Sequence, residues 1–159
     1  AATIYQPQSN PVFDRAMRAG RERFGESVLF SRHDSAKPLI RAIRQDKLGF
    51  FNLPDMDFGL KDAAFVPFFG VSAATLLAPS RMARLLGMTV QPVIARMREG
   101  GGWQVRFLPA WQGWPSDDAL SDTAWMNRWI EAEVRRDPAQ YLWVHKRFKT
   151  RPEGEPPVY

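Results

Sequence analysis

The last fifteen residues hold the densest group of cationic side chains in the chain. Four cations and one histidine fall within the seven positions from His145 to Arg151, with Phe148 among them. Such a group can bind phosphorylated headgroups or the acidic surface of a carrier protein. The candidate binding residues are Lys146, Arg147 and Lys149. A surface cluster closed by Glu153 and Glu155 would give the same pattern.

Two carboxylates, Asp55 and Asp57, alternate around Met56 directly after an apolar segment that we expect to be a strand. Loops at strand ends often carry functional groups, so the pair could orient an arginine or a substrate hydroxyl. The alternative is turn chemistry, in which Asp side chains bond nearby backbone amides and Gly59 takes a left-handed conformation. The two interpretations are compatible, and both stay open.

Capping residues and the spacing of apolar residues predict four helices. Asn10 followed by Pro11 favours a helix start, and Gly20 is expected to end this first helix. Ser35 is expected to cap the second helix, and Gly87 stands where a C-terminal cap belongs. The last two helices are predicted at 73–86 and at about 122–136.

Four apolar or β-prone segments predict strands, at 48–53, 64–69, 89–98 and 103–108. The run Glu99-Gly100-Gly101-Gly102 joins the last two and indicates an antiparallel hairpin, because glycine tolerates the positive φ angles of tight turns. Helices interspersed with a mainly apolar sheet predict an α/β fold, with a mixed sheet flanked by helices in a single domain, 1–159.

Composition and charge limit the possible partners. The chain has 159 residues, 45% of them hydrophobic and 13% aromatic, enough to build a core. A net charge of +5 favours anionic bilayers, phosphorylated lipid headgroups or an acidic carrier. Nucleic acid would satisfy the same charge, but no nucleic-acid-binding motif is present and no nucleic-acid partner is expected.

Missing residue types exclude several kinds of site. Without cysteine, the sequence can form neither a disulfide framework nor a thiolate metal site, and its two histidines are far apart. We expect no metal and no organic cofactor. No secretory signal is visible, and the most apolar window, 63–78, is shorter than the roughly 20 residues that cross a bilayer.

Six blocks resemble, in order, the late acyltransferases of lipid A biosynthesis, a family of lauroyl and myristoyl transferases related to the lysophospholipid acyltransferases. The blocks are Tyr5–Pro11, Gly20–Gly25, Leu53–Gly59, Phe65–Thr75, Trp125–Arg128 and Pro138–His145, which leads into the basic tail. Members of the family transfer a fatty acyl chain, usually from acyl carrier protein, to a hydroxyl of a lipid A precursor at the bacterial inner membrane.

The family's catalytic motif, a histidine followed five positions later by Asp or Glu, does not occur in this sequence. His33 is followed at that distance by Pro38, and His145 by Thr150. In the family the motif and a membrane anchor normally precede the first block. The resemblance therefore implies the C-terminal portion of a glycerolipid-acyltransferase-like domain, with a C-terminal hairpin and helices. The expected partners include the missing N-terminal catalytic segment.

The resemblance also implies roles for two arginines. Arg21 matches an arginine of the family's second block, which is implied to lie near the catalytic pair and the acceptor. A guanidinium there could hold phosphate oxygens or stabilise charge on the thioester carbonyl. Arg23 is a second substrate-binding candidate, and both could also be solvated residues at a helix end.

Several other side chains have one structural and one functional interpretation. Arg81 and Arg84 share a helix face, where they could bind lipid phosphates or be solvated. Four apolar residues could line an acyl-chain groove or form core, at about 0.8 kcal/mol per buried methylene: Phe65, Val66, Phe68 and Phe69. Trp111 and Trp114 could sit at a lipid interface, although packing is the simpler interpretation.

We therefore expect an acyltransferase of lipopolysaccharide biosynthesis at the cytoplasmic face of the inner membrane, inactive as these 159 residues alone. Its partners would be an acyl carrier protein thioester, a lipid A precursor and the anionic membrane surface. A non-catalytic module that binds anionic lipid is the alternative, and a nucleic-acid binder is a weaker one. The sequence leaves acyl length and the acceptor hydroxyl open.

Overall fold

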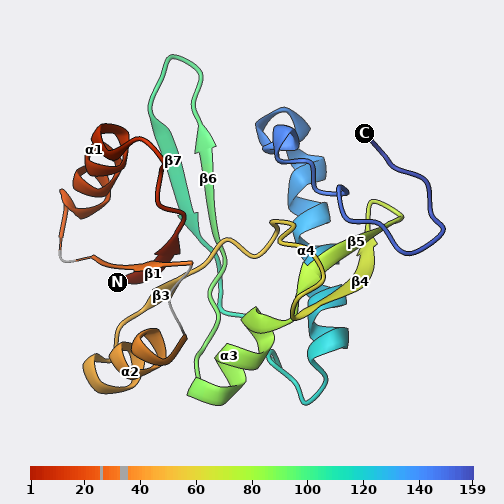
Figure 1. Cartoon of the computed structure of the whole chain (residues 1–159), viewed down its shortest axis with the longest axis horizontal. Coiled ribbons are helices and arrows are strands. Elements are labelled where there is room, and N and C mark those ends of the chain that lie inside the picture. Colours follow the sequence, from red (N-terminus) through yellow and green to blue (C-terminus); the bar gives the residue numbers. More distant parts are fainter. Residues whose placement is uncertain (26, 33–35) are drawn as a thin grey trace. The chain divides into compact units, whose positions relative to one another are not determined.

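A computed structural model of the protein describes residues 1–25, 27–32 and 36–159 (Figure 1). The chain divides into two compact units, Ala1–Leu53 and Pro54–Tyr159. Each unit has its own secondary structure and its own buried residues. The single domain expected over 1–159 stays a prediction.

The first unit is built on a three-stranded parallel sheet with the strand order β2-β1-β3. The strands are β1 (Ala2–Tyr5), β2 (Val28–Ser31) and β3 (Phe50–Phe51), connected by α1 (Pro11–Glu22) and α2 (Ala36–Asp46). Parallel neighbours require such crossover helices. Of these three strands, β3 alone falls within a predicted strand, 48–53. The four-residue strands β1 and β2 carry too little of a periodic pattern to be recognised.

Helix α1 begins where the sequence predicts and ends two residues later than expected. The Asn10 side chain accepts hydrogen bonds from the backbone N–H groups of Val12 and Phe13, at 2.9 and 3.2 Å. The expected end at Gly20 is wrong, since the helix continues to Glu22. A glycine inside a helix costs about 1 kcal/mol but does not have to end it.

Helix α2 packs through the apolar face that its spacing predicts. Leu39 and Ile43 are buried, as are Ala2 and Tyr5 of β1. These four are the buried apolar residues among the described part of the first unit. The predicted cap, Ser35, lies outside the described residues.

The second unit starts with a hairpin of β4 (Ala63–Phe68) and β5 (Val71–Leu76). The two turn residues between them, Phe69 and Gly70, both have positive φ, 51° and 76°, which suits the twist of a tight hairpin. The helix predicted from residue 73 is therefore wrong over its first part, because strand pairing overrides the helix propensity of Ala73 and Ala74.

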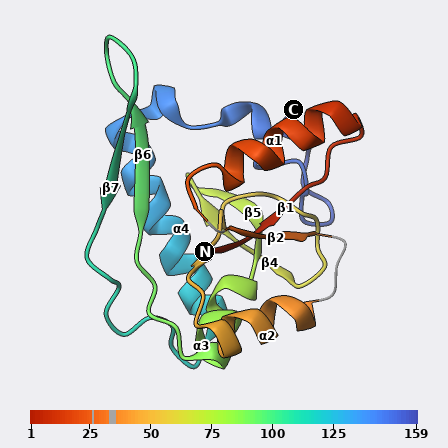
Figure 2. The ribbon, with the colours of Figure 1, turned by 90° about the vertical axis from the view of Figure 1, so that its left-hand side faces the viewer.

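Helix α3 (Ala78–Leu86) follows, and its predicted cap is confirmed: Gly87 is left-handed, with φ 60°. Next come β6 (Val93–Met97) and β7 (Trp103–Phe107), paired antiparallel as the glycine run predicts. The tip of this hairpin extends past the end of α4 in both views (Figures 1 and 2).

Helix α4 (Ala119–Arg136) is the longest helix of the second unit and begins three residues before its predicted start. The Asp118 side chain caps it by accepting from the N–H groups of Leu120 and Ser121. Two 3₁₀ helices follow, η1 (Pro138–Gln140) and η2 (Trp143–His145).

The second unit contains two buried apolar clusters. One consists of Phe68, Ala73 and Phe148, and the other of Ala83, Trp114 and Met126. Ile130 packs against both.

The α/β class is confirmed, but the described strands form three separate sheets rather than one mixed sheet. Side chains occupy strand edges where further strands would pair. Arg151 and Arg147 donate to the carbonyls of Ser72 and Ala74 on β5, at 2.6 and 2.7 Å. The Gln140 side chain bonds both the N–H and the C=O of Met97, at the end of β6. An edge whose polar groups are satisfied in this way does not recruit another strand.

Candidate functional site

The two arginine candidates of the first unit lie at the C-terminal end of α1. Arg21 is in the last turn, and Arg23 is the C-cap residue. Both are exposed, and the Arg23 guanidinium lies 4.1 Å from the centre of the Phe24 ring. Cations are favoured at this end of a helix because the last carbonyls carry partial negative charge. Both side chains are thus available to an anionic group.

In the second unit, Asp57 anchors the turn between Pro54 and Gly59 to the C-terminal tail. Its side chain is 1% exposed. The carboxylate accepts from the Gly59 N–H at 2.9 Å, and from the Thr150 N–H and hydroxyl at 3.0 and 2.9 Å. The turn-chemistry interpretation of Asp57 is confirmed, and the same carboxylate also fixes a residue 93 positions later.

Asp55, the other carboxylate of the pair, is half-buried and contacts the same tail. It forms a side-chain hydrogen bond with Tyr141, which follows η1. Burial and the Asp55 carboxylate together raise the pKa of the Tyr141 phenol above its ordinary value. The phenol therefore stays protonated and can serve as a donor to the carboxylate.

The three basic candidates of the tail differ in how exposed they are. Lys146 and Lys149 are exposed, as predicted, whereas Arg147 is 1% exposed. Its guanidinium donates to the Ala74 carbonyl at 2.7 Å and to the Thr75 hydroxyl at 2.6 Å. The surface position expected for Arg147 is therefore wrong, because the edge of β5 needs donors and the planar guanidinium supplies several at once.

Arg151 also donates to a backbone carbonyl of β5, that of Ser72. The same guanidinium pairs with Glu155. The tail thus closes on its own acidic residue, as one of the two sequence interpretations proposes. Lys146 lies with its Nζ 5.9 Å from the centre of the Tyr159 ring. Lys146 and Lys149 are the tail cations left on the surface to meet a phosphate or an acidic carrier.

His145 has a structural contact of its own in this network. Its Nε2 accepts a hydrogen bond from the Asp57 N–H at 3.0 Å, which requires that nitrogen to be unprotonated. The pKa of His145 is lowered, first by burial and then by Lys149 and Arg147, while Asp55 and Asp57 act in the opposite direction. The neutral imidazole is therefore the form that the fold selects.

This preference predicts a pH dependence of stability. The folded pKa lies below the ordinary value of 6.5, so the unfolded chain binds the proton more readily. The contribution of His145 is complete above about pH 6.5 and is lost as the pH falls through the folded pKa. We expect the free energy of unfolding, followed by tryptophan fluorescence, to decline across this interval.

The matched variant is His145→Gln, whose amide oxygen can accept from the Asp57 N–H and does not titrate. We expect this variant to lose less stability over the same pH interval. Equal pH dependence in the two proteins would contradict the assignment.

Arg81 and Arg84 lie on the exposed side of α3, each beside a carboxylate. The Arg81–Asp62 and Arg84–Asp117 pairs measure 3.9 and 2.5 Å, and both arginines are more than half exposed. They line an open hollow of about 460 Å³, together with Asp118 and the start of α4. A phosphate entering here would compete with acidic groups already in place, so binding by these two arginines stays a prediction.

The apolar candidates mostly form core. Val66 and Phe68 are buried, and Phe68 packs against Phe148 of the tail. Trp114 is buried and donates from its indole N–H to the Asp122 carbonyl, and Trp111 lies 5.1 Å from it, ring centre to ring centre. Packing is therefore confirmed for these side chains.

The sequence matches a family of known proteins over most of its length. Residues 1–150 match the bacterial lipid A biosynthesis acyltransferases. The chain belongs to that family.

Three relatives from Escherichia coli (strain K12) illustrate the extent of the similarity. The chain is 39% identical over 158 residues to the lipid A biosynthesis lauroyltransferase, 98% of this chain and 51% of that protein. It is 33% identical to the palmitoleoyltransferase over 98% of this chain and 50% of that protein. It is 35% identical to the myristoyltransferase over 97% of this chain and 47% of that protein. This member of the acyltransferase family thus spans about half the length of these relatives.

Sequence reasoning missed three polar residues that complete the site around the tail: Asn127, Tyr141 and Thr150. Asn127 is fully buried in α4 and donates to the Pro67 carbonyl and the Thr75 hydroxyl, both at 3.2 Å. A signal was present, because helical spacing places Asn127 on the face of Thr123, Ile130 and Val134. Tyr141 and Thr150 have no such periodicity to identify them.

Two further findings apply to the described residues of this acyltransferase-family chain. No three Asp, Glu or His side chains among them converge closely enough to hold a metal ion. No helix among them combines the length and the apolar character needed to span a membrane.

Proposed function

We propose that this protein acts in lipid A biosynthesis by transferring a fatty acyl chain from an acyl carrier protein thioester to a hydroxyl of a lipid A precursor. The single observation that carries the proposal is the family match over residues 1–150. The similarity to a lauroyltransferase along 98% of the chain agrees with it. The reaction would take place at the cytoplasmic face of the inner membrane.

In this proposal Arg21 stabilises negative charge on the phosphate of the acceptor or on the thioester oxygen, and Arg23 binds beside it. The exposure of both side chains at the end of α1 supports these roles. Lys146 and Lys149 offer exposed cations to the lipid phosphates or to the acidic carrier protein, and Arg81 and Arg84 offer two more. All of these contacts are electrostatic and need exposed side chains.

Asp55, Asp57 and Arg147 contribute differently in the same proposal. Asp57 and Arg147 are buried, so they hold the tail in place rather than touch substrate directly. Their hydrogen bonds to Thr150 and to the edge of β5 fix the backbone that carries Lys146 and Lys149. Asp55 is half-buried and acts through Tyr141.

The general base would be the histidine of the family's His-x₄-Asp/Glu motif. That base takes the hydroxyl proton as the oxygen attacks the thioester carbonyl, and the carrier thiolate leaves. Neither histidine of the 159 residues has the required acidic partner, and His145 already accepts a backbone hydrogen bond. In this proposal, a segment that bears the motif completes the active site.

We expect the purified 159-residue chain to transfer no acyl group from acylated carrier protein to a lipid A precursor. The matched control is the same chain joined to a family segment with the His-x₄-Asp/Glu motif, which we expect to be active. Product formation is measured by chromatography of radiolabelled lipid. Transfer by the chain alone would show that the base lies within these residues, and inactivity of the joined protein would argue against the proposed reaction.

A further inference from the structure

The hairpin of β4 and β5 has two outer edges, and its two strands are protected there in different ways. The register pairs Pro67 of β4 with Ser72 of β5. The carbonyls of both residues accept from side chains outside the hairpin, so their backbone groups point away from the partner strand. Pro67 has no N–H, and its carbonyl accepts from the Asn127 side chain at 3.2 Å. A proline in this place discourages a further strand from pairing with β4.

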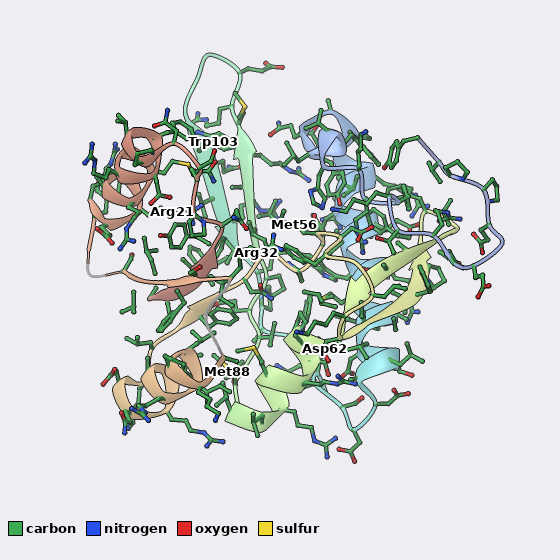
Figure 3. The ribbon with its side chains drawn as sticks, viewed as in Figure 1. Arg21, Arg32, Met56, Asp62, Met88 and Trp103 are labelled. Carbon is green, nitrogen blue, oxygen red and sulfur yellow. The ribbon has the colours of Figure 1, made fainter. Side chains whose placement is uncertain are left out.

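Strand β5 has no such protection in its own sequence. The strand, Val71–Leu76, contains neither proline nor a charged residue. It lies in a charge-free stretch, 63–80, bounded by Arg81 and by Asp62, which precedes β4 and is labelled in Figure 3. Strands of this composition pair with other chains when their edges are open. The protection of this edge therefore comes from elsewhere in the chain.

The C-terminal tail covers the outer edge of β5 and runs beside the strand (Figure 1). Arg151 donates to the Ser72 carbonyl at 2.6 Å. Arg147 donates to the Ala74 carbonyl at 2.7 Å. Residues 73–75 of the strand are at most 1% exposed. Because these contacts are buried within one unit, they do not depend on which outer surfaces of that unit are free.

Two further contacts hold the tail against the second unit. Phe148, between the two arginines in sequence, is buried against Phe68 of β4. Thr150 donates from its N–H and from its hydroxyl to the buried carboxylate of Asp57. The backbone that carries the two arginines is therefore fixed beside β5.

We propose that residues 147–151, which we call the edge guard, keep β5 from pairing with the same strand of a second copy of the chain. Two identical strands can pair antiparallel about a two-fold axis, and strands without charge do not repel each other. The edge guard lies far from β5 in sequence, since Arg147 follows Ala74 by 73 positions. The edge of β5 thus stays open until the end of the chain has docked. The edge guard protects the fold, whatever reaction the protein catalyses.

Removing both guanidinium groups tests the edge guard. We expect Arg147→Met with Arg151→Met, in the 159-residue chain, to strengthen self-association about tenfold or more over the unmodified chain, as measured by analytical ultracentrifugation. Hydrogen–deuterium exchange should become slower in the peptide that contains β5 as the protein concentration rises. Lys146→Met with Lys149→Met is the matched control, because it removes two charges from exposed positions of the same tail. This control should associate like the unmodified chain.

A proline in β5 makes the test specific to this edge. The backbone groups of Ser72 point away from β4, so Ser72→Pro keeps the ladder with β4 and removes a donor from the outer edge. Added to the two methionine substitutions, it should return self-association to the level of the unmodified chain. Association that persists with the proline, or that leaves exchange in β5 unchanged, would assign the contact to another surface and overturn the proposal.

Circular dichroism and tryptophan fluorescence establish that each variant is folded. If the double variant is unfolded, Arg151→Met decides alone, because it removes one bond to β5 and leaves Arg147 in place. We expect this variant to associate more strongly than the unmodified chain, and Ser72→Pro to reverse the change. A folded variant without Arg151 that associates no more strongly would overturn the proposal. These measurements use no acyl donor, so their outcome is independent of the proposed reaction.

Discussion

Replacing Arg147 with methionine is expected to lower the free energy of unfolding of the second unit by about 3 kcal/mol. Methionine fills part of the same volume but cannot donate to the Ala74 carbonyl or the Thr75 hydroxyl, which accept at 2.7 and 2.6 Å. Leaving a buried acceptor unsatisfied costs about 1 to 3 kcal/mol. The variant also loses the contact between the guanidinium and the Phe68 ring, 5.4 Å from its centre.

Urea unfolding followed by tryptophan fluorescence reports on the second unit, because all six tryptophans lie after residue 54. Lys149→Met is the matched control, a change from cation to thioether at an exposed position of the same tail, and should cost less than about 0.5 kcal/mol. Arg147→Lys should fall between them, since an ammonium group cannot reproduce the planar fork. Equal losses for Arg147→Met and Lys149→Met would show that the buried contacts do not stabilise the tail.

Replacing Arg21 with alanine, in an enzyme that includes this chain and the catalytic histidine, is expected to lower kcat/KM by about 10²- to 10³-fold. This is the usual cost of removing one donor that stabilises charge in the transition state. Arg21 is exposed at the end of α1, so its loss should leave the fold intact. Acyl transfer to a lipid A precursor, measured over a range of acceptor concentrations, separates kcat from KM.

Arg15→Ala is the control for this prediction, because Arg15 is exposed on the same helix and its loss changes the net charge equally. We expect it to reduce kcat/KM less than threefold, roughly the effect of altered long-range steering. A loss mainly in kcat for Arg21→Ala would indicate stabilisation of the oxyanion, whereas a loss mainly in KM would indicate binding of the acceptor phosphate. If both variants behave alike, Arg21 has no specific role in the reaction.

Local chemistry in the sequence was sufficient for several elements. Asn10 with Pro11 specified the start of α1, and Gly87 specified the end of α3. The glycines at 100–102 specified the antiparallel hairpin, because positive φ is a property of single residues. The ordered blocks also identified the family, which the match over residues 1–150 confirms. Each of the structural signals, unlike the blocks, involves residues within one turn or one segment.

Contacts between distant segments were decided by the tertiary structure alone. Arg147 looks like one of several tail cations until the edge of β5, 72 and 73 residues earlier, supplies its acceptors. Asp57 looks like a turn residue until Thr150 packs against it. The hydrogen bonds of Gln140 with Met97 and the pairing of Glu133 with Arg96 join the hairpin of β6 and β7 to later segments, and alternation within the strands does not reveal these contacts. Burial and hydrogen bonding at these positions come from neighbours far along the chain, so local periodicity contains no record of them.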